Sequence, residues 1–216
     1  MVLVTASISV TVVAAVLLTT PWLRAPWRTG PGPSQARRFL ADEMPVWVGE
    51  LEPGVLGVLG PVWGQDEPDL EHDRRLNEQL GLEAEQGLAW YHLLLFNRAE
   101  EARDVSLADG ALRIRPSVGA ERVELRSLAG LVARGEAQVA PSLAAVLSAR
   151  GALSETVEIP AGWMADLLVA FDRHVPLGEA VEVATRQGAA LEQRPMTRRD
   201  LDRLVEDPDR ALLEDL

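Results

Sequence analysis

The sequence predicts an α+β protein in which an antiparallel β-sheet or sandwich, with a helical insertion and peripheral helices, follows one N-terminal transmembrane helix. Three observations predict it. The first 20 residues carry no charged side chain, residues 88–97 are almost continuously apolar, and residues 104–115 have the pattern of a β-hairpin. We expect an anchor or uncleaved signal segment at 1–27, a Gly/Pro/Arg linker at 28–38, a β-rich globular domain at 39–196 and an acidic helical tail at 197–216.

The leading apolar segment is predicted to hold the chain in a cell membrane. Residues 2–20 are long enough to cross a hydrocarbon core as a helix, and Trp22 and Trp27 follow where interfacial aromatic residues gather. A cleaved signal peptide is the competing interpretation. However, no basic residue precedes the apolar run, and Val13-Ala14-Ala15 is a poor cleavage site. We therefore expect an uncleaved single-pass anchor.

The charge distribution divides the chain into a basic collar and an acidic body. The charged residues of the first 38 are Arg24, Arg28, Arg37 and Arg38, and since the whole chain has a net charge of −12, the remainder carries −16. Such a body is repelled by nucleic acid, which we exclude as a partner. The collar favours a cytoplasmic body by the positive-inside rule. The β-rich composition favours the extracytoplasmic side, which is the side we expect.

The first half of the body is expected to contain strands and one helix. Residues 45–49 and 55–63 are apolar pieces broken by turn residues, and we interpret them as short strands or an extended wrap. Residues 70–80 follow an acidic stretch that suits the start of a helix. The run at 88–97 is rich in aromatic residues and is typical of a strand buried on both faces.

A β-hairpin is predicted over residues 104–115. If Asp109-Gly110 forms a two-residue turn, Val105 faces Ile114 among the apolar pairs and Asp104 faces Arg115 among the polar pairs. Turn chemistry, register and an opposite-charge pair agree, and this agreement makes the hairpin the clearest structural prediction in the chain.

Two short helices are expected next, as an insertion beside the sheet. Ser127 is a suitable N-cap for a helix over 128–134. Pro141 suits the first position of a second helix, which Gly151 ends.

Strands are expected to resume in the last third. Residues 153–159 and 163–171 alternate in the manner of strands, and Gln187-Gly188 marks a weaker hairpin. Thr197 with Asp200 has the spacing that opens a final helix.

One acidic segment is a candidate for metal chemistry. Residues 66–73 hold five carboxylates and one imidazole, and hard oxygen ligands of this kind bind divalent cations. The candidate ligands are Asp69, Glu71, His72 and Asp73. The segment lacks the spacing of a calcium loop, so we favour a solvated acidic helix start and assign no metal, cofactor or catalytic residue.

The remaining chemistry-bearing residues point more to packing than to catalysis. His92 alternates with apolar residues on the central strand, as a buried structural histidine does, although His174 with Asp172 offers an acid–base partner for it. Exposed Trp47, Trp63 or Trp163 would suit sugar stacking, but core filling is the favoured interpretation. No Gly-x-Ser-x-Gly, Gly-x-Gly-x-x-Gly or Walker sequence occurs, and the absence of cysteine excludes disulfides and thiolate sites.

The order of elements resembles the immunoglobulin-like β-sandwich accessory modules of bacterial envelope proteins. The resemblance covers about residues 88–175: a long strand ends in Asn97, a Val-Ser-Leu strand follows, and Ile159-Pro160-Ala161-Gly162 leads into the strand at 167–171. The helices predicted between 127 and 150, and the missing Cys and Trp spacing, depart from that family. The resemblance implies adhesion or protein contact and carries over no catalytic residue.

We therefore expect a membrane-anchored, non-catalytic structural or protein-interaction module of a bacterial cell envelope. The alternative is a membrane-anchored hydrolase or metal-dependent enzyme that uses residues 66–73 with one of the other histidines. Convergence of the histidines and carboxylates in one cleft would favour the enzyme, and their separation would favour the module.

Overall fold

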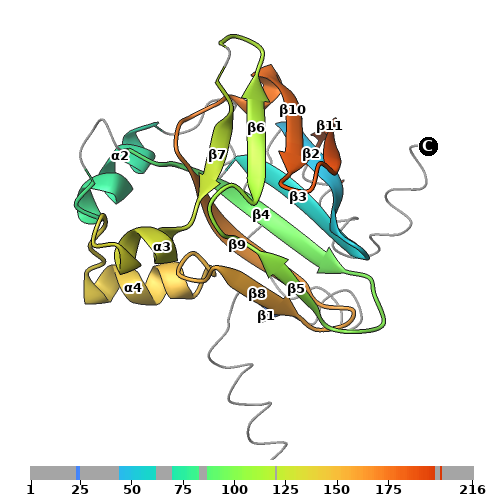
Figure 1. Ribbon diagram of the computed structural model, residues 1–216, viewed down its shortest axis with the longest axis horizontal. Helices are drawn as coiled ribbons and strands as arrows, with labels where there is room; N and C mark the ends of the chain where they lie inside the picture. The colour runs from blue at the N-terminus through green and yellow to red at the C-terminus, as the bar shows by residue number, and fades with distance from the viewer. Residues whose placement is uncertain are drawn as a thin grey trace, which may run out of the picture.

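The body of the protein is a closed antiparallel β-barrel of eight strands. A computed structural model describes residues 23–24, 44–61, 70–82, 87–119, 121–197 and 200. The barrel strands are β2 (Met44–Glu52), β3 (Val55–Pro61), β4 (Ala89–Asn97), β6 (Leu112–Pro116), β7 (Val123–Arg126), β9 (Met164–Phe171), β10 (Ala180–Thr185) and β11 (Ala190–Met196). They follow the order β9-β4-β3-β2-β11-β10-β6-β7, and β7 returns to β9 to close the ring (Figure 1).

The remaining described elements lie around this barrel. Strands β5 (Arg103–Ser106) and β8 (Thr156–Ile159) form a separate two-stranded sheet, and β1 (Leu23–Arg24) pairs with the first residues of β9. The helices are α2 (Leu70–Gln79), α3 (Leu128–Ala133) and α4 (Pro141–Ser148), with a 3₁₀ turn at Leu177–Glu179. All three α-helices gather on one side of the barrel (Figure 1).

The barrel interior is filled by alternate residues of its strands, as the two-residue period of a strand requires. On β4 these are Ala89, Tyr91, Leu93 and Leu95, and the Tyr91 ring meets the edge of Phe171 from β9 with centroids 5.2 Å apart. Val105 and Val157 of the two-stranded sheet belong to the same cluster. The small sheet therefore completes the barrel core instead of forming a second domain.

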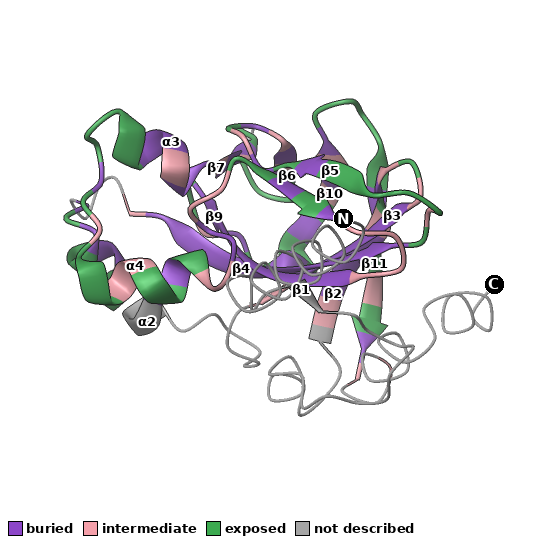
Figure 2. Cartoon of the chain, turned by 90° about the horizontal axis from the view of Figure 1, so that it is seen from below, coloured by how far each residue is buried: buried purple, intermediate pink, exposed green. Residues whose placement is uncertain are grey.

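Strands β4 and β9 are buried over their whole lengths (Figure 2). Their inward side chains fill the barrel, while Trp90 of β4 and Leu168 of β9 face outward and pack beneath the helices. Leu76 of α2 and Leu147 of α4 belong to this second cluster. The apolar run at 88–97 is thus a strand buried on both faces, as predicted, and around Trp90 the helices cover the side that would otherwise meet water.

The predicted sandwich is wrong, because the sheet closes on itself through the pairs Leu125↔Phe171 and Arg126↔Ala170. The immunoglobulin-like arrangement of two stacked sheets is therefore not the fold found. The predicted hairpin at 104–115 is also wrong. Gly110 does make a turn, with a φ of +72°, but Val105 pairs with Val157 of β8, and β6 pairs with β10 and β7.

Most other local predictions are confirmed. Ser127 caps α3 by accepting a hydrogen bond from the Gly130 backbone N–H at 3.0 Å, and Pro141 is the first residue of α4. The weaker hairpin joins β10 to β11. In the β2–β3 hairpin the Leu51 side chain occupies the space beside Gly57, since a Cβ there would lie 2.6 Å from Leu51 Cδ1.

Part of the predicted organisation lies outside the described residues. This applies to the membrane segment at 2–20, the linker at 28–38 and the tail beyond residue 200. Leu23–Arg24, placed in the anchor segment by the sequence, forms strand β1 instead. Among the residues that the structure describes, no helix has the length and apolar character needed to cross a bilayer.

Candidate functional site

The candidate metal ligands do not form a described site. Asp69 lies outside the described residues, and Glu71 and His72 are described only as backbone of α2. Asp73 is 6% exposed and accepts a hydrogen bond from the Trp90 backbone N–H at 3.3 Å, which fixes α2 against β4. Within the described ranges, no group of three or more metal-binding side chains comes together. The enzyme alternative is based on residues 66–73, and most of the side chains in that segment lie outside the described part of the chain.

A buried ionic cluster surrounds Asp166 on the outer face of β9. His92 Nδ1 lies 3.0 Å from one carboxylate oxygen, and Arg150 donates to the other at 2.7 Å. Burial raises the pKa of the Asp166 carboxyl, but hydrogen bonding and charge attraction from His92 and Arg150 outweigh burial and leave that pKa below its usual value. The His92–Asp166 pair resembles the histidine and carboxylate of a catalytic triad, in which the carboxylate orients the histidine that acts as the base. With Asp166 only 4% exposed, we interpret the cluster as a structural charge network.

His174 lies on the other side of β4. Tyr91 projects inward where its neighbour His92 projects outward, and the Tyr91 hydroxyl lies 3.3 Å from His174 Nδ1. The same hydroxyl donates to the Val175 carbonyl at 2.8 Å and accepts from the Val175 N–H at 2.9 Å. Burial raises the pKa of Tyr91 above its usual value. The hydroxyl thus fixes the segment after β9 and is poorly suited to lose its proton.

The acid–base partnership considered for His92 does not form. Asp172 accepts a hydrogen bond from the Glu124 backbone N–H at 3.2 Å, and burial raises the pKa of its carboxyl. His92 is paired with Asp166, while His174 contacts Tyr91 on the interior side. The two histidines therefore serve separate parts of the fold. Trp47 is likewise a core residue, donating from Nε1 to the Leu177 carbonyl at 3.0 Å.

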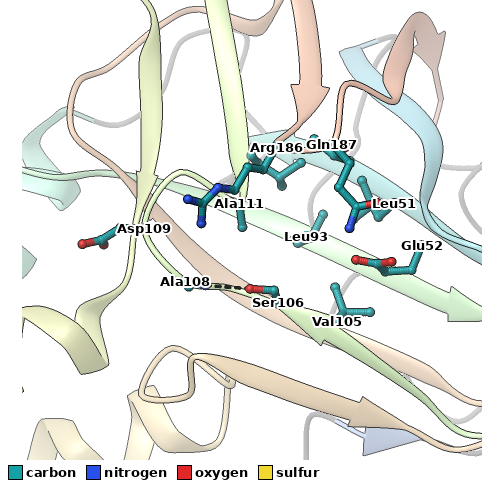
Figure 3. A pocket seen from close by; sticks show the side chains of 12 residues that line it. Leu51, Glu52, Leu93, Val105, Ser106, Ala108, Asp109, Ala111, Arg186 and Gln187 are labelled. Atoms are coloured by element: carbon teal, nitrogen blue, oxygen red, sulfur yellow. Dashed lines mark hydrogen bonds between the residues drawn. The ribbon is translucent and has the colours of Figure 1, made fainter.

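A cavity among the described residues lies at one end of the barrel, and we call it the mouth pocket (Figure 3). It is bounded by the ends of β2 and β10, the start of β6 and the β5 strand that crosses this end. Its volume is about 190 Å³. The floor is aliphatic and consists of Leu51, Leu93, Val105 and Leu112.

Polar side chains form the rim of the mouth pocket. Arg186 and Gln187 follow β10 on one side, and Glu52 ends β2 on the other (Figure 3). Asp109 also borders the pocket, but its carboxylate turns away and accepts from the Ser127 backbone N–H at 2.7 Å. The rim therefore offers donors and an acceptor around an apolar floor, an arrangement typical of binding sites.

The sequence interpretation did not find this pocket. Its lining comes from segments more than 100 residues apart, and they meet only because the sheet closes into a barrel. One signal was available: the predicted turn at Gln187-Gly188 places exposed Arg186 and Gln187 at a strand end, where binding residues often lie.

Comparison of the chain with protein-family models, curated proteins and solved structures found no match. Function is therefore inferred from the geometry of the described residues, in which the mouth pocket combines an apolar floor with accessible polar groups.

Proposed function

We propose that this protein is a membrane-anchored, non-catalytic interaction module of a bacterial cell envelope, which holds one side chain of a protein partner in its mouth pocket. The size of the pocket carries the proposal. Pockets for drug-sized molecules occupy about 300–1,000 Å³, whereas the mouth pocket has about 190 Å³. A space of that size suits a single anchoring side chain at the centre of a protein interface.

The lining indicates the chemistry of the partner. Leu93 and Val105 provide an aliphatic floor that suits a leucine-like or aromatic anchor. Arg186, Gln187 and Glu52 on the rim offer hydrogen bonds to the backbone beside such an anchor. The body outside the first 38 residues carries a net charge of −16, so a basic partner would be steered towards it.

The membrane part of the proposal rests on residues 2–20, whose length and lack of charge support a single-pass anchor. We place the body on the extracytoplasmic side, although Arg24, Arg28, Arg37 and Arg38 favour the opposite side. Reporter fusions at the C-terminus decide between the two sides. Activity of an extracytoplasmic reporter supports our assignment, and activity of a cytoplasmic reporter contradicts it.

The mouth pocket is tested by site-specific photo-crosslinking of the full chain in native membranes. A benzophenone amino acid replaces Gln187, which is exposed on the rim. We expect a discrete protein adduct. A second substitution, Ala108→Trp, fills the pocket from its wall and should reduce the adduct at least fivefold, because the anchor side chain loses its space.

The matched control is Ala102→Trp, which adds the same ring at an exposed position outside the pocket and should leave the adduct unchanged. Urea unfolding verifies that both tryptophan variants remain folded. Equal adduct yields from A108W and A102W, or no adduct from position 187, would contradict binding in the mouth.

A further inference from the structure

The outer face of β6, β7 and β10 carries a concentration of arginines, of which only Arg186 also lines the mouth pocket. A groove of about 140 Å³ runs over this face. We define the arginine groove by four of its lining residues, Arg113, Arg115, Arg122 and Arg186. Glu182 is the acidic residue that lines it. The protein as a whole has a net charge of −12, so this face has the opposite sign to the rest of the chain.

The strand register brings the arginines together. Arg113 stands opposite Glu124 and Ile114 opposite Val123, so one further step of the same register sets Arg122 opposite Arg115. Like charges opposite each other on antiparallel strands destabilise a sheet. The Arg186 backbone N–H donates to the Ala111 carbonyl at 2.9 Å, which extends the β10–β6 pairing towards the mouth. The sheet therefore brings the four arginine side chains to the lining of one groove.

Internal carboxylates neutralise only part of this charge. Arg113 Nε lies 3.1 Å from Glu124 Oε1, and Arg115 lies 3.0 Å from Glu182 Oε2. Among the residues that the structure describes, no carboxylate lies within ion-pair distance of Arg122 or Arg186. Both side chains are exposed and line the groove, so two cationic groups border it.

We infer that the arginine groove is a binding site for a phosphate group. The guanidinium plane presents paired donors that match the oxygens of phosphate, and charge-assisted bonds of this kind are the strong ones. An anion between Arg115 and Arg122 would also relieve their cross-strand repulsion. The phosphate belongs either to a small soluble molecule or to the headgroup of an anionic lipid, and both present the same oxygens to the groove.

The test measures thermal unfolding of the full chain in neutral detergent micelles, since a ligand bound to the folded state raises the midpoint. One arm adds inorganic phosphate against chloride at equal ionic strength. The other replaces a fraction of the detergent by phosphatidic acid, against phosphatidylcholine. We expect the midpoint to rise in at least one arm. A rise with inorganic phosphate identifies a soluble ligand, and a rise with phosphatidic acid alone identifies a lipid headgroup.

Variants locate the binding. Arg122→Gln removes one unpaired cation without touching the mouth pocket, and the apparent affinity should fall about tenfold, the loss expected for a hydrogen bond to a charged group. Arg103→Gln removes an exposed arginine of β5 outside the groove and should change nothing. The inference is overturned if neither probe raises the midpoint, or if R122Q and R103Q respond alike.

Thermal unfolding with phosphate and crosslinking at position 187 together distinguish binding in the arginine groove from binding in the mouth pocket. Ala108→Trp fills the mouth and should leave the response to phosphate unchanged, whereas Arg122→Gln should leave the crosslink at position 187 unchanged. Failure of either proposal therefore leaves the other standing.

Discussion

Two walls of the same barrel are built for different purposes. In the wall formed by β4 and β9 every residue is buried, and helices cover the outer face around Trp90 and Leu168. In the wall formed by β6 and β10 burial alternates, with Leu112 and Ile114 inside and Arg113 and Arg115 outside. The outer face of β4 and β9 packs against helices, whereas no such cover is described over the outer face of β6 and β10. The position of the helices therefore determines which outer face can present polar side chains to a ligand.

The largest effect is expected in the helix-covered wall. Leu168→Ala removes a buried side chain from the outer face of β9, where it packs with the helices, and we expect the free energy of unfolding to fall by about 3–5 kcal/mol. Val181→Ala on β10 is the matched change in the open wall, since Val181 is 52% exposed, and should cost less than about 0.5 kcal/mol. Urea titration measures both values. Equal losses would contradict the contrast between the walls.

A smaller effect is expected from the ionic cluster on β9. Asp166→Asn leaves the buried His92 and the half-buried Arg150 without their shared carboxylate, and we expect the free energy of unfolding to fall by about 2–3 kcal/mol near neutral pH. The pKa of Asp166 is lower in the folded protein than in the unfolded chain. The Asp166 carboxylate therefore contributes its full stabilisation to the folded state at pH values above its pKa in the unfolded chain. This stabilisation is lost as the pH falls towards the pKa that Asp166 has in the folded protein.

The difference between wild type and D166N should accordingly shrink as the pH falls below about pH 4. Unfolding in urea at several pH values measures it. A difference that does not shrink below about pH 4 would show that the carboxylate does not stabilise the cluster.

The smallest effect is expected at Glu182 in the open wall. Glu182→Gln breaks a surface ion pair with Arg115, and the free energy of unfolding should change by less than about 0.5 kcal/mol. Because the substitution removes the acidic lining of the arginine groove, the affinity for phosphate should rise severalfold. Unfolding and phosphate titration of the same variant test both statements. Weaker phosphate binding by E182Q would place the anion elsewhere.

The sequence predicted local structure well where a signal was complete within a few residues. The apolar run that became β4, the Ser127 cap of α3 and the β10–β11 hairpin are of this kind. Strand partners were harder to predict. Asp109-Gly110 satisfies hairpin chemistry, yet Val105 pairs with Val157 because burial in the barrel core selects a partner 52 residues away.

The binding sites were less predictable for the same reason. The alternation of Arg113 and Arg115 with apolar residues is visible in the sequence, but the approach of Arg122 and Arg186 depends on the order of β7, β6 and β10. The mouth pocket depends in turn on closure of the barrel, for which no short motif exists.

One edge of β9 is shared by two segments from distant parts of the chain. Arg126 of β7 pairs with Ala170, and Leu23 of β1 pairs with Ala165. A mechanical load on the leading end of the chain would therefore reach β9 through β1 before any other described strand. If that end is embedded in a bilayer, tension between bilayer and body would act on the strand that seals the ring.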